Sequence, residues 1–241
     1  MRFEIPPQLA DADDTGLLVV AGSHAYGLET PDSDVDYRGF FMAPTRDLLG
    51  VRSVKETRTW TDPDVSMHEV GKFCRLALEA NPTVLEVLAI EDPVVTSPLA
   101  DDLRANLGAF LSDRVRMRFG GYARSQFHRL KKREGSFSAD TQKRTAKHAR
   151  HLLRLVRQGA HLMETGELRV RVDDRDELFA FGELPYEEMI PVAEAELDRF
   201  DKIPSTLPPE PDFDLVHDIL VGHRLALIGL PDSISGGTIR G

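Results

Sequence analysis

The sequence of 241 residues predicts an α/β fold of the α+β kind, with an N-terminal sheet domain followed by a helical domain. Three observations favour this class. A continuous apolar run occupies residues 17–21, alternating β-branched segments follow, and the apolar period changes to that of helices from about residue 69. We therefore place the sheet domain at residues 1–98 and the helical domain at 99–241.

Four strands are predicted in the N-terminal half. Residues 17–21 form an apolar run bounded by glycines, which is typical of a buried strand. Turn-forming residues then precede a second strand, which we expect over residues 34–42. An alternating, β-branched segment predicts a third strand over residues 51–61, and a short fourth strand begins near Asp64.

Helices account for most of the remaining chain. An apolar i, i+3, i+4 pattern that starts near residue 69 ends at Asn81-Pro82, where Thr83 is expected to cap a short helix. Gly166 is a predicted helix stop, and the proline-rich residues 203–211 are expected to be extended. Beyond residue 98 the predicted helices are 99–112, 113–133, 140–165, 187–200 and 212–228.

The composition indicates the cellular compartment of the protein. The sequence has a single cysteine, Cys74, so it cannot form an internal disulfide, and the surrounding apolar pattern predicts a buried thiol. No apolar signal segment opens the sequence, and the longest apolar runs are too short to span a bilayer. We therefore expect a cytoplasmic protein without a membrane partner. Its oligomeric state does not follow from the sequence.

Charge is distributed unevenly. Residues 114–157 contain 14 basic and two acidic residues, so this segment carries +12 while the rest of the chain, given a total of −10, carries −22. In this segment Lys147 and His148 each follow a basic residue four positions earlier, so one helix presents adjacent positive groups. We predict that Lys147 and His148 bind an anion. The alternative is a solvated face that pairs with the acidic half.

The candidate site combines a glycine turn with two carboxylates. Gly22-Ser23 ends the first strand, where a glycine lets the backbone approach a phosphate and the serine hydroxyl can bind its oxygens. Ten residues later, Asp34 and Asp36 occupy positions i and i+2 of the second strand and should point to the same side. Two carboxylates suit Mg²⁺, with Mn²⁺ as the alternative, because such ions keep open positions for substrate phosphates. The pattern predicts a triphosphate site beside a metal site.

These motifs resemble a known superfamily. The segments GSHAYGLETPDSDVDYRG and DVSMHEVGKFCRLALEANPTVLEVL, with GYARSQFHRLK and KHARHLLRL in the helical half, are similar to the DNA polymerase β-like nucleotidyltransferases. The resemblance is to the subgroup of predicted enzymes that includes those associated with RNA ligases and RNA repair. It implies a small mixed sheet flanked by helices, two-metal chemistry, and transfer of a nucleoside monophosphate from a nucleoside triphosphate to an acceptor hydroxyl.

The resemblance also implies a third metal-binding carboxylate that draws the proton from the acceptor. We choose Asp64, which precedes a strand-like segment, and keep Glu69 and Asp62 as alternatives. Arg38 continues the alternation of the second strand, so it should share a face with the aspartates. It would bind phosphate there, or balance the carboxylates through an ion pair.

We expect an enzyme that acts on an acceptor hydroxyl. If the acceptor is a nucleic-acid end, residues 114–157 supply the phosphate contacts. The alternatives are a protein adenylyltransferase of the antitoxin type, which modifies a Tyr, Ser or Thr side chain, and a catalytically silent nucleotide-binding regulatory module.

Overall fold

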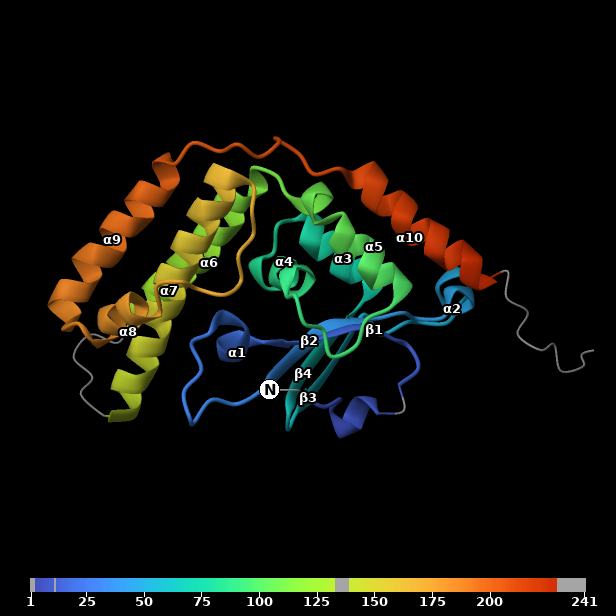
Figure 1. Cartoon of the computed structure of the whole chain (residues 1–241), viewed down its shortest axis with the longest axis horizontal. Helices are drawn as coiled ribbons and strands as arrows, with labels where there is room; N and C mark the ends of the chain where they lie inside the picture. The colour runs from blue at the N-terminus through green and yellow to red at the C-terminus, as the bar shows by residue number, and fades with distance from the viewer. Residues whose placement is uncertain (1–2, 11, 133–138, 229–241) are drawn as a thin grey trace, which may run out of the picture.

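The computed structural model describes residues 3–10, 12–132 and 139–228 (Figure 1). A four-stranded sheet has the order β1-β2-β4-β3, in which β2 and β4 are parallel and the other neighbours antiparallel. The predicted fold class, a small mixed sheet with helices around it, is therefore confirmed. The strands are β1 (Thr15–Ala21), β2 (Asp36–Phe41), β3 (Thr57–Thr61) and β4 (Asp64–Glu69).

Short helices connect and cover the strands of the N-terminal half. The prediction that Thr83 caps α4 was wrong: the side chain of Asn81 accepts a hydrogen bond from the backbone N–H of Val84 at 3.3 Å. Pro82 occupies the first helical position, which proline favours because it has no N–H to leave unpaired. The cap is therefore Asn81, two residues before the predicted one. These elements are η1 (Pro7–Leu9), α1 (Gly22–Tyr26), α2 (Thr45–Leu49), α3 (Val70–Leu78) and α4 (Pro82–Ala89).

The C-terminal half is helical, as predicted. The helix expected over 99–112 is instead two pieces, α5 and η2, because Asn106 leaves the helical conformation with φ −107°. Helix α8 was not predicted, since its apolar residues are consecutive and lack the helical i, i+3, i+4 spacing. Helix α7 ends before Gly166, which has the expected positive φ of 75°. The elements are α5 (Pro98–Ala105), η2 (Leu107–Phe110), α6 (Arg114–Lys131), α7 (Ala139–Thr165), α8 (Arg175–Glu183), α9 (Tyr186–Lys202) and α10 (Phe213–Ile228).

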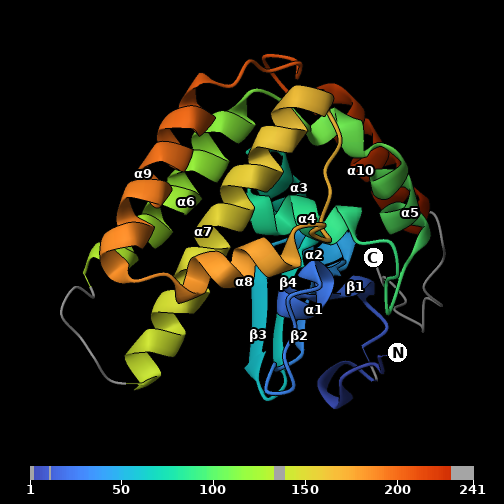
Figure 2. The same cartoon turned by 60° about the vertical axis from the view of Figure 1, so that its left-hand side comes forward.

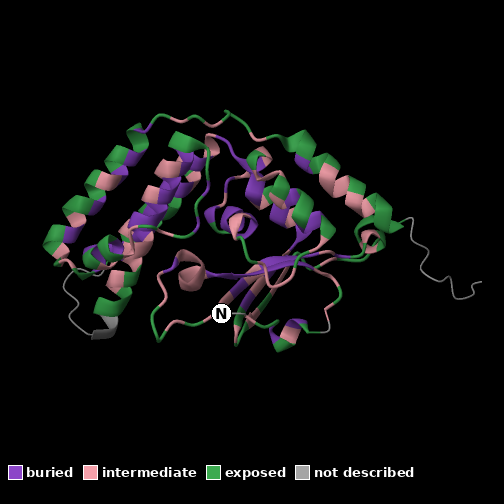
Figure 3. Cartoon of the chain, viewed as in Figure 1, coloured by how far each residue is buried: buried purple, intermediate pink, exposed green. Residues whose placement is uncertain are grey.

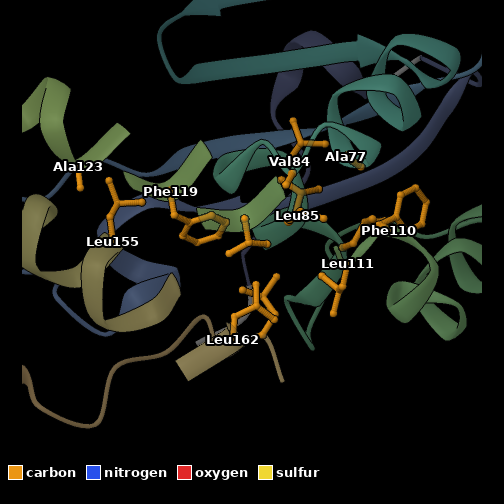
Figure 4. Close-up of a cluster of buried hydrophobic side chains, with 14 of the residues drawn as sticks. Ala77, Val84, Leu85, Phe110, Leu111, Phe119, Ala123, Leu155 and Leu162 are labelled. Carbon is orange, nitrogen blue, oxygen red and sulfur yellow. The ribbon is translucent and has the colours of Figure 1, made fainter. Parts of the chain in front are cut away.

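One buried cluster joins the sheet to the helical half. It begins with Leu17, Val19 and Phe40 on one face of the sheet, continues through α3 and α4, and reaches α6, α7 and α9. Figure 4 shows this continuity, with Leu85 of α4 among Phe119 of α6 and the leucines of α7. In Figure 3 the buried residues accordingly lie on the inward sides of these helices. The shared core fixes the position of α7 relative to the sheet.

The opposite face of the sheet carries a second, smaller cluster. Leu18, Val20, Phe41 and Met67 are buried there. Trp60, the single tryptophan, packs against this cluster. Cys74 is buried as predicted, which raises the pKa of its thiol to about 12. None of the described helices has the length and apolar character needed to cross a membrane. Residues 203–211 connect α9 to α10 without regular structure, as expected (Figure 1).

Candidate active site

The Gly22-Ser23 turn is fixed by its backbone conformation. Strand β1 ends at Ala21, and α1 begins at once with Gly22 at φ 65°, in the left-handed region that glycine adopts without steric cost. A Cβ added at Gly22 would also collide with the Oδ2 atom of Asp36. Glycine is therefore required twice, and it brings the turn into contact with the Asp36 carboxyl group.

Asp36 and Asp64 are paired across the parallel strands. They are directly opposite in the register of β2 and β4, and their carboxyl groups share a hydrogen bond. Burial raises the pKa of Asp36, and the hydrogen bond and negative charge of Asp64 raise it further against the opposing effect of Arg38. The sheet therefore places two hard oxygen ligands side by side in a position that favours a nearby positive charge.

Arg38 provides part of that positive charge. Its guanidinium donates to both carboxylate oxygens of Asp64, at 3.1 and 2.9 Å, and lies 3.7 Å from Asp36. The hydrogen bonds from Arg38 hold the pKa of Asp64 below its usual range. The sequence left two roles open for Arg38, phosphate binding and an ion pair with the carboxylates. The structure shows the ion pair.

Asp34 lies before the strand on which it was expected. The prediction of a strand over residues 34–42 was wrong at its start, because β2 begins at Asp36. Asp36 pairs with Ala21, the last residue of β1, so the backbone of residues 34 and 35 has no strand to pair with. Asp34 is exposed at the edge of the cleft described below. Its role as a metal ligand stays a prediction.

The two alternatives to Asp64 are placed differently. The carboxylate of Glu69 accepts hydrogen bonds from the Gly71 backbone at 2.7 Å and from Arg224 at 2.5 Å, and Glu69 is only 5% exposed. It therefore caps α3 and anchors α10. Asp62 is exposed in the turn between β3 and β4. Among these three, Asp64 alone pairs with Asp36, and its catalytic role stays a prediction.

A cleft of about 1530 Å³ opens beside the carboxylates. One wall contains Gly22, Ser23, Asp34 and Asp36, and the facing wall is formed by α6, α7 and α8. Figure 2 shows α8 and the N-terminal part of α7 on the same side of the molecule as α1. Lys147 and His148 line the same cleft, so six of the eight predicted site residues do. The other two, Arg38 and Asp64, contact Asp36 directly.

Eleven of the 14 basic residues of the segment 114–157 fall into two groups. Seven hold the helices to neighbouring elements through carboxylate or carbonyl oxygens: Arg114, Arg116, Arg118, Arg124, Lys131, Arg154 and Arg157. Four others line the cleft, and within the described part of the chain no carboxylate lies within 4.0 Å of them: Arg129, Lys143, Lys147 and Arg150. The positive charge that is not used in ion pairs is thus concentrated opposite Asp36, whose carboxylate is influenced by Lys147.

The two histidines of this wall are held by neighbours. The Nδ1 atom of His148 lies 2.8 Å from the side-chain amide oxygen of Gln126 in α6. Burial, and then the charge of Arg154, lower the pKa of His151 to about 3, so His151 is neutral at physiological pH. His151 therefore contributes no positive charge to this wall.

Sequence reasoning missed a buried network behind the cleft. Tyr26 donates to Glu86 at 2.7 Å, Arg154 donates to the other oxygen of Glu86 at 2.6 Å, and the guanidinium lies 3.7 Å above the Tyr26 ring. Arg154 also donates to Gln158 at 3.0 Å. A signal was present, because Glu86 and Arg154 are single charges inside apolar helical runs. The network connects α1, which begins at Gly22, to α4 and to the helix that carries Lys147.

The donor set agrees in part with a divalent cation. Among the described residues, no group of three or more His, Cys, Asp or Glu side chains is arranged to hold a metal ion. Asp36 and Asp64 nevertheless offer two adjacent carboxyl groups, and burial and then the neighbouring Asp64 raise the pKa of Asp36, which a bound cation would oppose. The residues present therefore fit an ion such as Mg²⁺ if Arg38 releases Asp64.

Comparison with known proteins agrees with this arrangement. Residues 14–182 match the model of RlaP, the RNA repair pathway DNA polymerase beta family. The chain belongs to this family. The match covers both walls of the cleft, from β1 to α8, and it confirms the predicted membership of the DNA polymerase β-like nucleotidyltransferase superfamily.

Two further similarities were found. The chain is 32% identical over 120 residues to an uncharacterized 38.9 kDa protein of the nrdC-mobD intergenic region of Enterobacteria phage T4. The match covers 44% of this chain and 35% of that relative, so the chain spans about a third of its length. The crystal structure of a nucleotidyltransferase-like protein from Exiguobacterium sibiricum 255-15 shares 18% identity over 81% of this chain and 71% of that one, with a TM-score of 0.32. That score is too low to support an argument.

Proposed function

We propose that this protein transfers a nucleoside monophosphate from a nucleoside triphosphate to an acceptor hydroxyl in a Mg²⁺-dependent reaction. The observation that supports it most directly is the Asp36–Asp64 pair at the edge of a cleft. The opposite wall presents lysine and arginine side chains that have no carboxylate partner among the described residues. Phosphoryl transfer to a hydroxyl requires carboxylates that bind a cation and, facing them, basic groups that bind phosphate.

The triphosphate is the ligand we assign to the cleft. Ser23 and the Gly22 backbone bind phosphate oxygens from one wall, while Lys147, with Arg129 and Lys143, binds them from the other. This role also changes the expectation that residues 114–157 bind a nucleic-acid acceptor. Among the described residues of this segment, seven basic side chains are used in ion pairs or hydrogen bonds to neighbouring elements, and four others face into the cleft.

Asp36, Asp64 and Asp34 are the residues that would hold a divalent cation. Such an ion, Mg²⁺ or Mn²⁺, supplies charge stabilisation at the α-phosphate and a lower pKa for the acceptor hydroxyl when bound. Asp64, which is the outer member of the pair and 49% exposed at its side chain, faces the acceptor and accepts its proton. The bond that forms joins the acceptor oxygen to the α-phosphorus, and the bond that breaks releases pyrophosphate.

A transfer assay tests this proposal. Nucleoside triphosphates labelled at the α-phosphate are incubated with the protein, Mg²⁺ or Mn²⁺, and oligonucleotide or protein acceptors. We expect transfer by the wild type, none by Asp36→Asn, and wild-type transfer by Asp62→Asn, a matched change in an exposed aspartate of the β3–β4 turn. Absence of transfer, together with absence of metal-dependent triphosphate binding, would overturn the proposal.

One observation favours a second candidate, the catalytically silent nucleotide-binding module. Arg38 occupies both oxygens of Asp64, which removes one cation ligand for as long as the ion pair persists. A silent module would bind triphosphate without transfer in the wild type and in Arg38→Gln alike. If the protein is an enzyme, we expect transfer by the wild type, because a bound cation and triphosphate would provide Asp64 and Arg38 with alternative partners.

A further inference from the structure

The face of the sheet that carries the carboxylate pair continues beyond it with polar side chains. Ser66 and His68 follow Asp64 at alternate positions of β4 and so share its face. In the register with β3 they are opposite Thr59 and Thr57. On the β1 and β2 side of this face, α3 covers the sheet through contacts such as Phe73 with Phe40. The β3 and β4 side remains accessible: the residues along it are exposed or partly exposed.

A chain of hydrogen bonds organises this surface. Lys72 of α3 lies 2.7 Å from the Thr57 hydroxyl, which lies 3.1 Å from Nδ1 of His68. An ammonium group only donates, so Thr57 accepts from Lys72 and donates its own hydrogen to His68. The proton of the neutral imidazole is then on Nε2. Burial, with the charges of Lys72 and Arg38, lowers the pKa of His68 and keeps it neutral.

The surface is rich in hydrogen-bond donors, and the negative charge of Glu56 acts on His68. In the described part of the chain, no carboxylate lies within 4.0 Å of the Lys72 ammonium, whereas the nearby Arg75 is paired with Glu56 at 2.5 Å. Lys72 retains two N–H donors, His68 offers Nε2–H, and Ser66 offers a hydroxyl. This set of donors is complementary to a phosphate group.

We propose that this surface, consisting of Ser66, His68 and Lys72, binds a phosphate of a nucleic-acid acceptor strand next to its terminal hydroxyl. The inference rests on the proposed transfer reaction and names its acceptor. In an in-line displacement the hydroxyl attacks from the side opposite the departing pyrophosphate. If the triphosphate lies between Ser23 and Lys147, the acceptor approaches from the side of Asp64, which is where this surface begins.

Spacing along β4 favours a polynucleotide over a second contact with the same triphosphate. At about 3.3 Å per residue, Ser66 lies about 7 Å and His68 about 13 Å along the strand from Asp64. A hydroxyl held at Asp64 can thus belong to the same terminal nucleotide as a phosphate held at Ser66 and His68. Lys147, by contrast, lies on the cleft wall that faces the Gly22-Ser23 turn.

The test measures binding of a fluorescent single-stranded RNA decamer by anisotropy in EDTA, over a series of salt concentrations. We expect Lys72→Gln to weaken binding several-fold and to reduce the slope of log K against log salt by about 0.7, the value for one phosphate contact to a single strand. Ser66→Ala should weaken binding without changing the slope, because it removes no charge, and it provides the answer if Lys72→Gln does not fold.

Lys55→Gln is the matched control, because it removes one exposed positive charge close to β3. Its RNA affinity and slope should be those of the wild type. Wild-type affinity in both Lys72→Gln and Ser66→Ala would overturn the proposal, and so would loss of affinity in Lys147→Gln but not in Lys72→Gln. A wild-type protein that binds no RNA even at low salt would also refute it.

A separate measurement distinguishes this inference from the proposed function. Binding of a fluorescent ATP analogue with Mn²⁺ should be equal in the wild type and Lys72→Gln. If the wild type does not bind the analogue, the proposed function fails, while the RNA titration still decides whether this surface binds polynucleotide. If the analogue binds and RNA does not, only the identity of the acceptor is refuted.

Discussion

Arg154 of α7 donates a hydrogen bond to Glu86 of α4 at 2.6 Å, and their side chains are only 2% and 4% exposed. This ion pair joins the helix that carries Lys147 to the layer that covers the sheet. Burial of both charges makes the pair sensitive to loss of one partner, since the remaining charge has no access to water.

The single substitution Arg154→Met should therefore destabilise the protein by about 3–5 kcal/mol, because it leaves Glu86 buried and unpaired. The double substitution Glu86→Leu with Arg154→Met should recover part of that loss, since an apolar pair removes both charges but leaves the Tyr26 hydroxyl without its acceptor. Urea unfolding of the wild type and both variants measures this. Equal stability of the single and double variants would show that the pair is not the cause.

Gly22→Ala is expected to destabilise the turn by about 1–2 kcal/mol, the cost of a left-handed conformation for a residue with a Cβ. It should also abolish metal-dependent triphosphate binding, because the new Cβ displaces the Asp36 carboxyl group. Gly121→Ala is the matched control: nothing lies within 4 Å of a Cβ added there, and the site is an exposed position of α6. Helix propensity favours the control by up to about 1 kcal/mol. Normal triphosphate binding by Gly22→Ala would contradict this prediction.

The sequence was sufficient to locate the turn and Asp36 because both follow from local rules. A strand has a period of two, and a glycine at a strand end marks a close approach of the backbone. Predicting the partner of Arg38 requires the register of β2 with β4, and these strands are separated by α2 and β3. No local pattern encodes that register. The sequence alone therefore could not decide whether Arg38 forms an ion pair or binds phosphate.

The boundaries of the elements and the partners of the basic residues could not be predicted from the sequence for similar reasons. The start of β2 at Asp36 depends on where β1 ends, which is a property of the pair and not of either segment. The basic residues of α6 and α7 looked equivalent in the sequence, yet Arg118 is paired with Glu79 while Lys147 faces the cleft. Only the packing of the helices decides which basic side chains form ion pairs with neighbouring elements and which face the cleft.

Lys147→Gln should weaken triphosphate binding about tenfold or more, because a hydrogen bond to a charged group contributes about 1.5–3 kcal/mol. Titration of a fluorescent nucleotide with Mn²⁺ measures the affinity. Arg124→Gln is the control, since Arg124 is paired with Asp201 at 2.5 Å and does not line the cleft. Equal losses in the two variants would indicate a general effect of net charge and exclude a specific contact by Lys147.

Opposite pKa shifts at Asp36 and Asp64 predict opposite effects of neutralising them. The pKa of Asp36 is raised in the folded protein, so this group stabilises the fold only at low pH, and that contribution is lost as the pH rises above the ordinary value of 3.8. Asp36→Asn should therefore be more stable than the wild type at pH 7, with a difference that shrinks as the pH falls towards 3.8.

The pKa of Asp64 is lowered by Arg38, so this group stabilises the fold above 3.8 and loses that contribution as the pH falls through its folded value. Asp64→Asn should accordingly be less stable than the wild type at pH 7. Urea unfolding at pH 7 and at successive lower values compares both variants with the wild type. Two shifts of the same sign at pH 7 would mean that the charge balance around Arg38 differs from the one described here. Opposite signs would show that the Asp36 carboxylate is destabilised by burial and by Asp64, while the Asp64 carboxylate is stabilised by Arg38.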